Sequence, residues 1–232
     1  MYKCTFFHEL QLFLWFFFNF TLPVDDIFIQ NYILFHLGKK KPNFKNRVSS
    51  HFEFWVGLNS PEWLLNIIKH GVSTPFETNP PKVFLPKSSL ILSRQNFLWV
   101  KAKLQEFLDY GFVLMVKDPP DCVLSLKNTS QKIALIHDMS PLNEYVEKSK
   151  FTLEGWEEMF EYSKGAKFAV PFDLKKYYHQ IAIHCDFRIY FGFTFPFFED
   201  KEPQYFIWNT LPYGYNTAPF IARSLMKPLI SK

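Results

Sequence analysis

The stretch Phe172-Asp173-Leu174-Lys175-Lys176-Tyr177-Tyr178-His179-Gln180-Ile181 places a carboxylate directly after an apolar run. The run, Phe168-Ala169-Val170-Pro171-Phe172, predicts a β-strand whose end would hold Asp173 on rigid backbone. A carboxylate in such a position is suited to binding divalent metal ions. The stretch therefore predicts a metal-binding aspartate, with the aromatic ring of Tyr178 following close behind it in the chain.

Further motifs lie on both sides of this stretch, in a fixed order. They are Gln131–Asn143 upstream, then Ile183–Phe193, Tyr205–Trp208 and Leu211-Pro212-Tyr213-Gly214-Tyr215-Asn216-Thr217-Ala218-Pro219 downstream. One motif alone carries a high risk of a false match, whereas several in order do not. Together they resemble the reverse transcriptases of retrotransposons, over roughly residues 47 to 230. The ending Met226–Ile230 looks closest to DIRS-like or related LTR-type retroelements.

The resemblance implies an α+β fold, with the fingers and an incomplete palm of a right-hand polymerase and no thumb. By this reading residues 1–38 are an aromatic-rich extension outside the resemblance, 39–165 are fingers-like, and 166–232 form a partial palm. The partners implied are an RNA or DNA template-primer and deoxynucleoside triphosphates. The cofactor implied is Mg²⁺, two ions in the intact family, which this chain is not expected to bind fully.

The resemblance also implies roles for particular residues. Asp173 would be catalytic and would bind metal together with the backbone carbonyl of Leu174, and Tyr178 would act as a steric gate under the sugar. The remaining positions are nucleotide-binding residues and residues that position template and primer: Tyr213, Gly214 and Lys132 for the first group, and Leu211, Pro212 and Gly214 for the second.

The chain departs from the family at the expected phosphate contacts. An arginine usually stands where this chain has Ala134, and a second basic position is occupied by Ser140. A methyl group cannot replace the planar fork with which arginine binds a triphosphate. Lys127 and Lys132 offer point charges instead, although the favoured reading of each is an ordinary exposed strand lysine.

The family's second catalytic motif, Tyr-x-Asp-Asp, does not follow Pro219 within these 232 residues. The pair Asp25-Asp26 stands on the wrong side of Asp173, and Pro23 occupies the tyrosine position. One aspartate cannot build a site for two metal ions. We therefore expect a reverse transcriptase fragment that does not polymerise by itself. The alternative is a non-catalytic remnant that binds nucleic acid through lysines and exposed aromatic rings.

Composition places the chain among globular proteins, with 48% hydrophobic and 21% charged residues. The net charge of +4 permits contact with nucleic acid but does not by itself indicate it. Three scattered cysteines favour a reducing, intracellular compartment, the cytoplasm or nucleus. The apolar run at residues 12–20 is too short for a membrane-spanning helix, so a membrane role ranks last.

Local patterns predict the remaining elements. Ser60 and Ser93 are candidate helix N-caps, with Gly71 and Gly111 as the ends of the two helices. A polar turn at residues 128–131 predicts a hairpin between 123–127 and 132–136.

His179 and His184 point to opposite faces of an extended strand and should not share a metal ion. A surface pair between Asp186 and Arg188 is also expected.

Overall fold

The computed structural model describes residues 14–17, 48–84, 93–127, 136–148, 155–165, 169–172, 174, 176–197, 202 and 204–230. The chain divides into two compact units, which are described separately. Unit 1 comprises residues 1–43 and 152–175, and unit 2 comprises residues 44–151 and 176–232. This division follows packing, so it does not test the fingers and palm boundaries predicted from the sequence.

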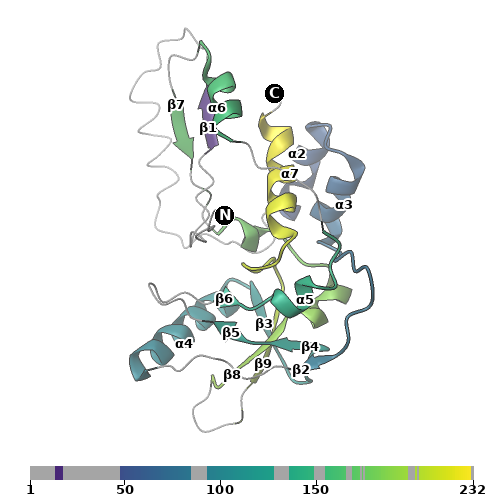
Figure 1. Cartoon of the computed structure of the whole chain (residues 1–232), viewed down its shortest axis with the longest axis vertical. Helices are drawn as coiled ribbons and strands as arrows, with labels where there is room; N and C mark the ends of the chain where they lie inside the picture. The colour runs from purple at the N-terminus through teal and green to yellow at the C-terminus, as the bar shows by residue number, and fades with distance from the viewer. Residues whose placement is uncertain are drawn as a thin grey trace, which may run out of the picture. The chain divides into compact units, whose positions relative to one another are not determined.

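Unit 2 is built on a mixed five-stranded sheet with the strand order β2-β4-β8-β9-β3 (Figure 1). The strands are β2 (Val83–Phe84), β3 (Val113–Val116), β4 (Cys122–Leu124), β8 (Gly192–Phe195) and β9 (Gln204–Trp208). The β2–β4 and β4–β8 pairs are parallel, while β8–β9 and β9–β3 are antiparallel. Together with its helices, this sheet confirms the α+β class predicted from the sequence.

The long helix α4 (Arg94–Asp109) confirms the prediction made from its apolar stripe. The Ser93 side chain accepts a hydrogen bond from the Asn96 amide at 3.3 Å, which satisfies one of the free amides of the first turn. Val100 and Leu104 are buried, and Phe97 stacks on Phe195 of β8. The helix therefore covers the sheet with the face that the sequence indicated.

Short helical segments accompany the other helices in the described part of unit 2 (Figure 1). They are η1 (Ser49–His51), α5 (Ser140–Asn143), η2 (Tyr178–Gln180) and η3 (Cys185–Tyr190), with α2 (Phe52–Gly57), α3 (Glu62–His70) and α7 (Ala218–Ile230). Trp63 of α3 stacks on Phe220 of α7, with ring centroids 5.9 Å apart. The predicted α3 is confirmed, but its N-cap is Pro61 rather than Ser60, whose hydroxyl is buried without a hydrogen-bond partner among the described residues.

The core of unit 2 is rich in aromatic side chains that alternate along β8 and β9. Phe193 stacks on Phe206 with centroids 5.4 Å apart, and Trp208 is fully buried beside them. The first residue of β8, Gly192, lies close to the neighbouring parallel strand. A Cβ at this position would lie 2.5 Å from the Cys122 carbonyl oxygen, so the contact requires glycine. The high aromatic content of the sequence is thus partly explained by this core.

The predicted hairpin is present in altered form. The strands β5 (Leu126–Lys127) and β6 (Ile136–His137) pair antiparallel, with Leu126 opposite His137 and Lys127 opposite Ile136. Residues 128–135, which include the predicted four-residue turn, lie outside the described residues. The preceding segment, β4, belongs to the large sheet, because its backbone groups pair with β2 and β8 instead.

Unit 1 contains the strand that precedes Asp173. This strand, β7 (Ala169–Phe172), confirms the prediction from the sequence, and it pairs antiparallel with β1 (Leu14–Phe17) of the amino-terminal extension. Leu14 lies opposite Phe172, and helix α6 (Trp156–Ser163) lies beside β1 (Figure 1). The extension therefore supplies a strand to β7, which its sequence did not indicate. No helix in the described parts of the chain is long and apolar enough to span a membrane.

Candidate functional site

Three segments of unit 2 are joined by hydrogen bonds: residues 136–143, residues 178–182 and residues 210–217. The Leu211 amide donates to the Ile181 carbonyl at 3.0 Å, and the ring of His179 places Nδ1 3.1 Å from the Leu211 carbonyl oxygen. Ala182 and Thr210 form an antiparallel bridge next to them. These contacts bring the predicted Tyr178 and the predicted Leu211–Gly214 loop together.

Asn143 joins the first segment to the third. Its side-chain Nδ2 donates to the Gly214 carbonyl at 2.8 Å, and its Oδ1 accepts from the Asn216 amide at 3.1 Å. One amide side chain thus satisfies a donor and an acceptor of the same loop. Sequence reasoning assigned no role to Asn143, since the contact joins residues more than seventy positions apart and leaves no local signal.

Gly214 is required by both its backbone angle and its surroundings. Its φ of +98° lies in the region that residues with a side chain rarely adopt. A Cβ there would lie 2.8 Å from the His137 carbonyl oxygen. The loop can approach the first segment this closely only with glycine at this position.

Tyr178 and Tyr213 form an aromatic pair at this site. Their ring centroids are 5.3 Å apart at an interplanar angle of 52°. Tyr178 is only 6% exposed, and its hydroxyl is buried without a hydrogen-bond partner in the described part of the chain, whereas Tyr213 is 36% exposed. Burial, with the neighbouring Tyr213, raises the pKa of Tyr178 to about 12. Tyr178 therefore stays a neutral phenol that still has a hydrogen bond to offer.

His179 packs beside this pair, and its role is structural because its ring is buried among other aromatic rings. Its ring stacks on Trp208 with centroids 5.2 Å apart and on Phe112 with centroids 5.0 Å apart. Burial lowers the pKa of His179 to about 3, so the ring is neutral and Nδ1 can donate to Leu211. His137, whose Nε2 lies 3.1 Å from the Gly192 carbonyl oxygen, is likewise buried, and burial lowers its pKa to about 4.

The turn before Tyr178 is fastened to helix α4 and helix α7. Lys176 has a φ of +53° and forms an ion pair with Glu106 of α4, and its Nζ lies 4.8 Å from the centre of the Tyr110 ring. Tyr177 donates its hydroxyl to the Ala222 carbonyl of α7 at 3.0 Å. This hydrogen bond joins the turn to α7.

Several predicted site residues are not placed by the structure. Asp173, Lys132 and Ala134 lie outside the described residues, and of Lys127 only the backbone is described. Leu174 is described, in unit 1. Leu211 and Pro212 are both buried within the loop. Binding of metal and phosphate by these positions therefore stays a prediction, while the arrangement of Tyr178, Leu211, Tyr213 and Gly214 is now defined.

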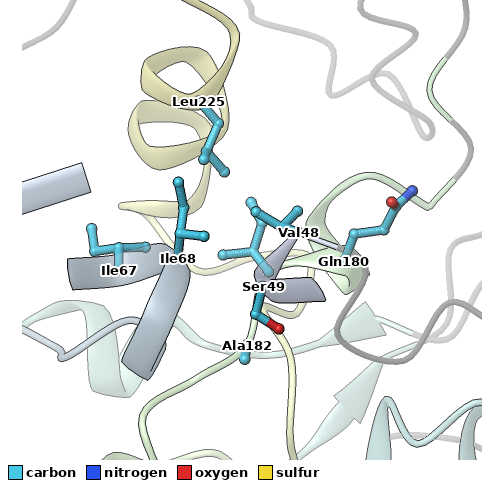
Figure 2. A pocket seen from close by; sticks show the side chains of 8 residues that line it. Val48, Ser49, Ile67, Ile68, Gln180, Ala182 and Leu225 are labelled. Atoms are coloured by element: carbon cyan, nitrogen blue, oxygen red, sulfur yellow. The ribbon is translucent and has the colours of Figure 1, made fainter. Parts of the chain in front are cut away.

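An apolar hollow lies behind η2, between α3 and α7 (Figure 2). Ile67 and Ile68 reach it from α3, Leu225 reaches it from α7, and Ser49 and Gln180 add polar atoms at its edge. None of its lining residues carries a charge. The hollow is thus unsuited to a triphosphate, and it is best described as loose packing beneath the site.

Comparison with known proteins relates this arrangement to a family. Residues 123–232 match the model of the family described as reverse transcriptase (RNA-dependent DNA polymerase). Over these residues the chain is similar to the reverse transcriptase family. The match covers all three joined segments of the site and the core strands β8 and β9.

Viral polyproteins are among the relatives of this segment. The chain is 30% identical to the genome polyprotein of Petunia vein clearing virus (isolate Shepherd) over 95 residues, which are 41% of this chain. It is 27% identical to the Pol polyprotein of Equine infectious anemia virus (isolate 1369) over 143 residues, which are 60% of this chain. The matched regions make up only 4% and 12% of those two polyproteins.

Proposed function

We propose that these 232 residues hold nucleotide and template in the manner of a reverse transcriptase but do not extend a primer by themselves. The observation that carries the proposal is the joining of the Tyr178 turn, the Asn143 segment and the Tyr213–Gly214 loop within the matched region. The source we favour is a retroelement of the DIRS-like or a related LTR type, on the resemblance of the sequence motifs.

The described residues suggest what each part of this site would do. The half-exposed ring of Tyr213 offers a face on which a base can stack. The buried ring of Tyr178 would lie under the sugar and would exclude a ribose hydroxyl by bulk, which favours deoxynucleotides. Asn143 holds the Gly214 carbonyl and the Asn216 amide of the loop, so the backbone near Gly214 is fixed before any ligand arrives.

The predicted metal ligand Asp173 lies outside the described residues, which therefore do not test a two-ion centre. Two divalent ions would activate the primer hydroxyl and steady the leaving pyrophosphate, and they need several converging carboxylates. In the part of the chain that the structure describes, one group of three or more His, Cys, Asp or Glu side chains has its ligand atoms within 4.8 Å of one another: His184, Cys185 and Asp186. This group is not the predicted pair of Asp173 and Leu174. We therefore assign no catalytic step to a metal here.

Equilibrium binding tests the holding function. A fluorescently labelled RNA–DNA primer-template is titrated with the purified chain, and anisotropy is measured at several salt concentrations. We expect Tyr213→Ala to weaken binding by about 1–3 kcal/mol, the usual contribution of a stacked base. Tyr190→Ala is the matched control, because Tyr190 packs against Phe76 outside the joined segments. No binding, or equal affinity for both variants, would contradict the proposal.

The alternative function is a non-catalytic nucleic-acid-binding remnant. Ala134, at a position where the family usually has arginine, favours it, since the triphosphate then lacks a bidentate partner. It predicts salt-dependent binding that deoxynucleoside triphosphate does not strengthen. The titration above, repeated with and without the next correct deoxynucleotide, separates the two functions.

A further inference from the structure

Three consecutive side chains with different donor atoms meet at the start of η3. They are the imidazole of His184, the thiol of Cys185 and the carboxylate of Asp186, and all three come from the surface of unit 2. The sequence-based prediction treated His184 only in relation to His179 and paired Asp186 with Arg188. The structure instead has Arg188 donate its Nε to the Ile183 carbonyl at 3.0 Å.

The donor atoms lie close enough together to reach one ion. Cys185 Sγ lies 3.3 Å from Asp186 Oδ1, His184 Nδ1 lies 3.7 Å from Asp186 Oδ2, and Cys185 Sγ lies 4.0 Å from His184 Nδ1. With one ligand atom from each residue, all three atoms lie within 4.8 Å of one another. Zinc bonds of about 2.0–2.3 Å at a tetrahedral angle place neighbouring ligand atoms roughly 3.3–3.6 Å apart, so binding requires the side chains to draw together.

The backbone that carries these side chains is held firmly. The His184 amide donates to the Val72 carbonyl at 3.0 Å, and the Ile183 amide donates to the Asn209 carbonyl at 3.0 Å. A Cβ at Gly71 would lie 2.7 Å from the His184 backbone nitrogen, so the two backbone segments are in close contact there. Ligands on such a fixed turn lose little conformational freedom when an ion binds.

The donor set selects the class of ion. A thiolate and an imidazole favour zinc and similar softer ions over Mg²⁺ and Ca²⁺, which prefer oxygen ligands. A thiolate and a carboxylate together balance the double charge of the ion. Cys185 and Asp186 are exposed, so water can reach the fourth position.

We propose that His184, Cys185 and Asp186 form a binding site for a zinc-class divalent ion, with water as the fourth ligand. Binding forms a metal–sulfur bond and releases the thiol proton of Cys185 to solvent. The imidazole stays neutral and binds through Nδ1, giving up its long 3.4 Å hydrogen bond from the Asp186 amide. The site is independent of the proposed nucleotide-holding function, because none of its three ligands belongs to the joined segments.

Metal titration of the full chain tests this site directly. Cys4→Ala/Cys122→Ala is the starting protein, since Cys185 is then its single thiol. Co²⁺ is added first, and the thiolate-to-metal absorption band is followed until it saturates. Zn²⁺ is then titrated against a chromophoric chelator, with a large excess of Mg²⁺ present. We expect one equivalent of either ion and no competition from Mg²⁺.

Variants distinguish the proposed ligands from their surroundings. Cys185→Ser should abolish the absorption band, and Asp186→Asn should weaken Zn²⁺ binding at least about tenfold. Asp118→Asn is the matched control at another exposed aspartate and should leave binding unchanged. Thermal melts of each variant without metal report whether the fold is kept. No bound ion, or binding that survives Cys185→Ser in a folded protein, would overturn the proposal.

Discussion

Unit 1 and unit 2 differ in how their strands are supported. In unit 2 the strand β9 lies between two partners, and its Phe206 and Trp208 are fully buried. In unit 1 the strand β7, which leads to Asp173, belongs to a two-stranded sheet with β1 as its partner. Such a pair is marginally stable by itself in water. The residues that would hold a nucleotide therefore lie in the well-packed unit, and the strand before the predicted metal ligand lies in the other.

Amide hydrogen exchange should show the largest difference between the units. We expect the amides of β8 and β9 to exchange only through global unfolding, since they pair on both sides or lie in the core. The amides of β7 should exchange faster by orders of magnitude. Exchange followed by mass spectrometry resolves both segments. Equal protection of β7 and β9 would remove the distinction between the units.

Core substitution in unit 2 should have the next largest effect. Trp208→Ala removes a fully buried ring that packs against Phe107, His179 and Phe193, so we expect a loss of about 3–5 kcal/mol in unfolding free energy. Trp63→Ala is the matched control, because Trp63 is 46% exposed. Urea unfolding followed by circular dichroism measures both. A similar loss for the two variants would contradict the packing described for β9.

Acid should destabilise unit 2 through its two buried histidines. The pKa values of His137 and His179 are lowered from 6.5 to about 4 and about 3, so the unfolded chain takes up protons first as the pH falls. The unfolding free energy of unit 2 is therefore unaffected by these histidines above about pH 6.5. It falls progressively toward pH 3, by on the order of a few kcal/mol. His179→Phe should flatten this dependence, and His70→Gln, at an exposed position, should not. Unfolding free energies at several pH values decide between these outcomes.

The Lys176–Glu106 pair should contribute least. Burial tends to raise the pKa of Glu106, but hydrogen bonds to Lys176 and Lys103 outweigh it and lower the value. Because both partners of the pair are partly exposed, we expect Lys176→Met to cost at most about 1 kcal/mol. Lys164→Met in unit 1 breaks a more exposed pair with Glu161 and should give no measurable change. A large loss for Lys176→Met would show that the turn before Tyr178 depends on this one contact.

Local features of the fold could be predicted from the sequence. The Ser93 cap and the stripe of Val100 and Leu104 predicted α4, because capping and periodicity act over one helix. The order β2-β4-β8 could not be predicted, since the parallel β4–β8 pair joins residues near 123 to residues near 192. The pairing of β1 with β7 was missed for the same reason.

The candidate site was predicted in part. Tyr178, Tyr213 and Gly214 were found through the family motifs, and the structure brings them together. Asn143 was missed because its two hydrogen bonds cross to a distant loop. The His184–Cys185–Asp186 group was missed because an extended strand would point alternate side chains apart, whereas the 3₁₀ turn gathers them.

Primer extension is the most direct test of the central claim, that this chain holds nucleotide and template without polymerising. The purified 232-residue chain is mixed with a primed RNA template, deoxynucleoside triphosphates and Mg²⁺ at a concentration that saturates template binding. We expect the chain to bind the primed template without extending the primer. Robust extension that Asp173→Asn abolishes would contradict it.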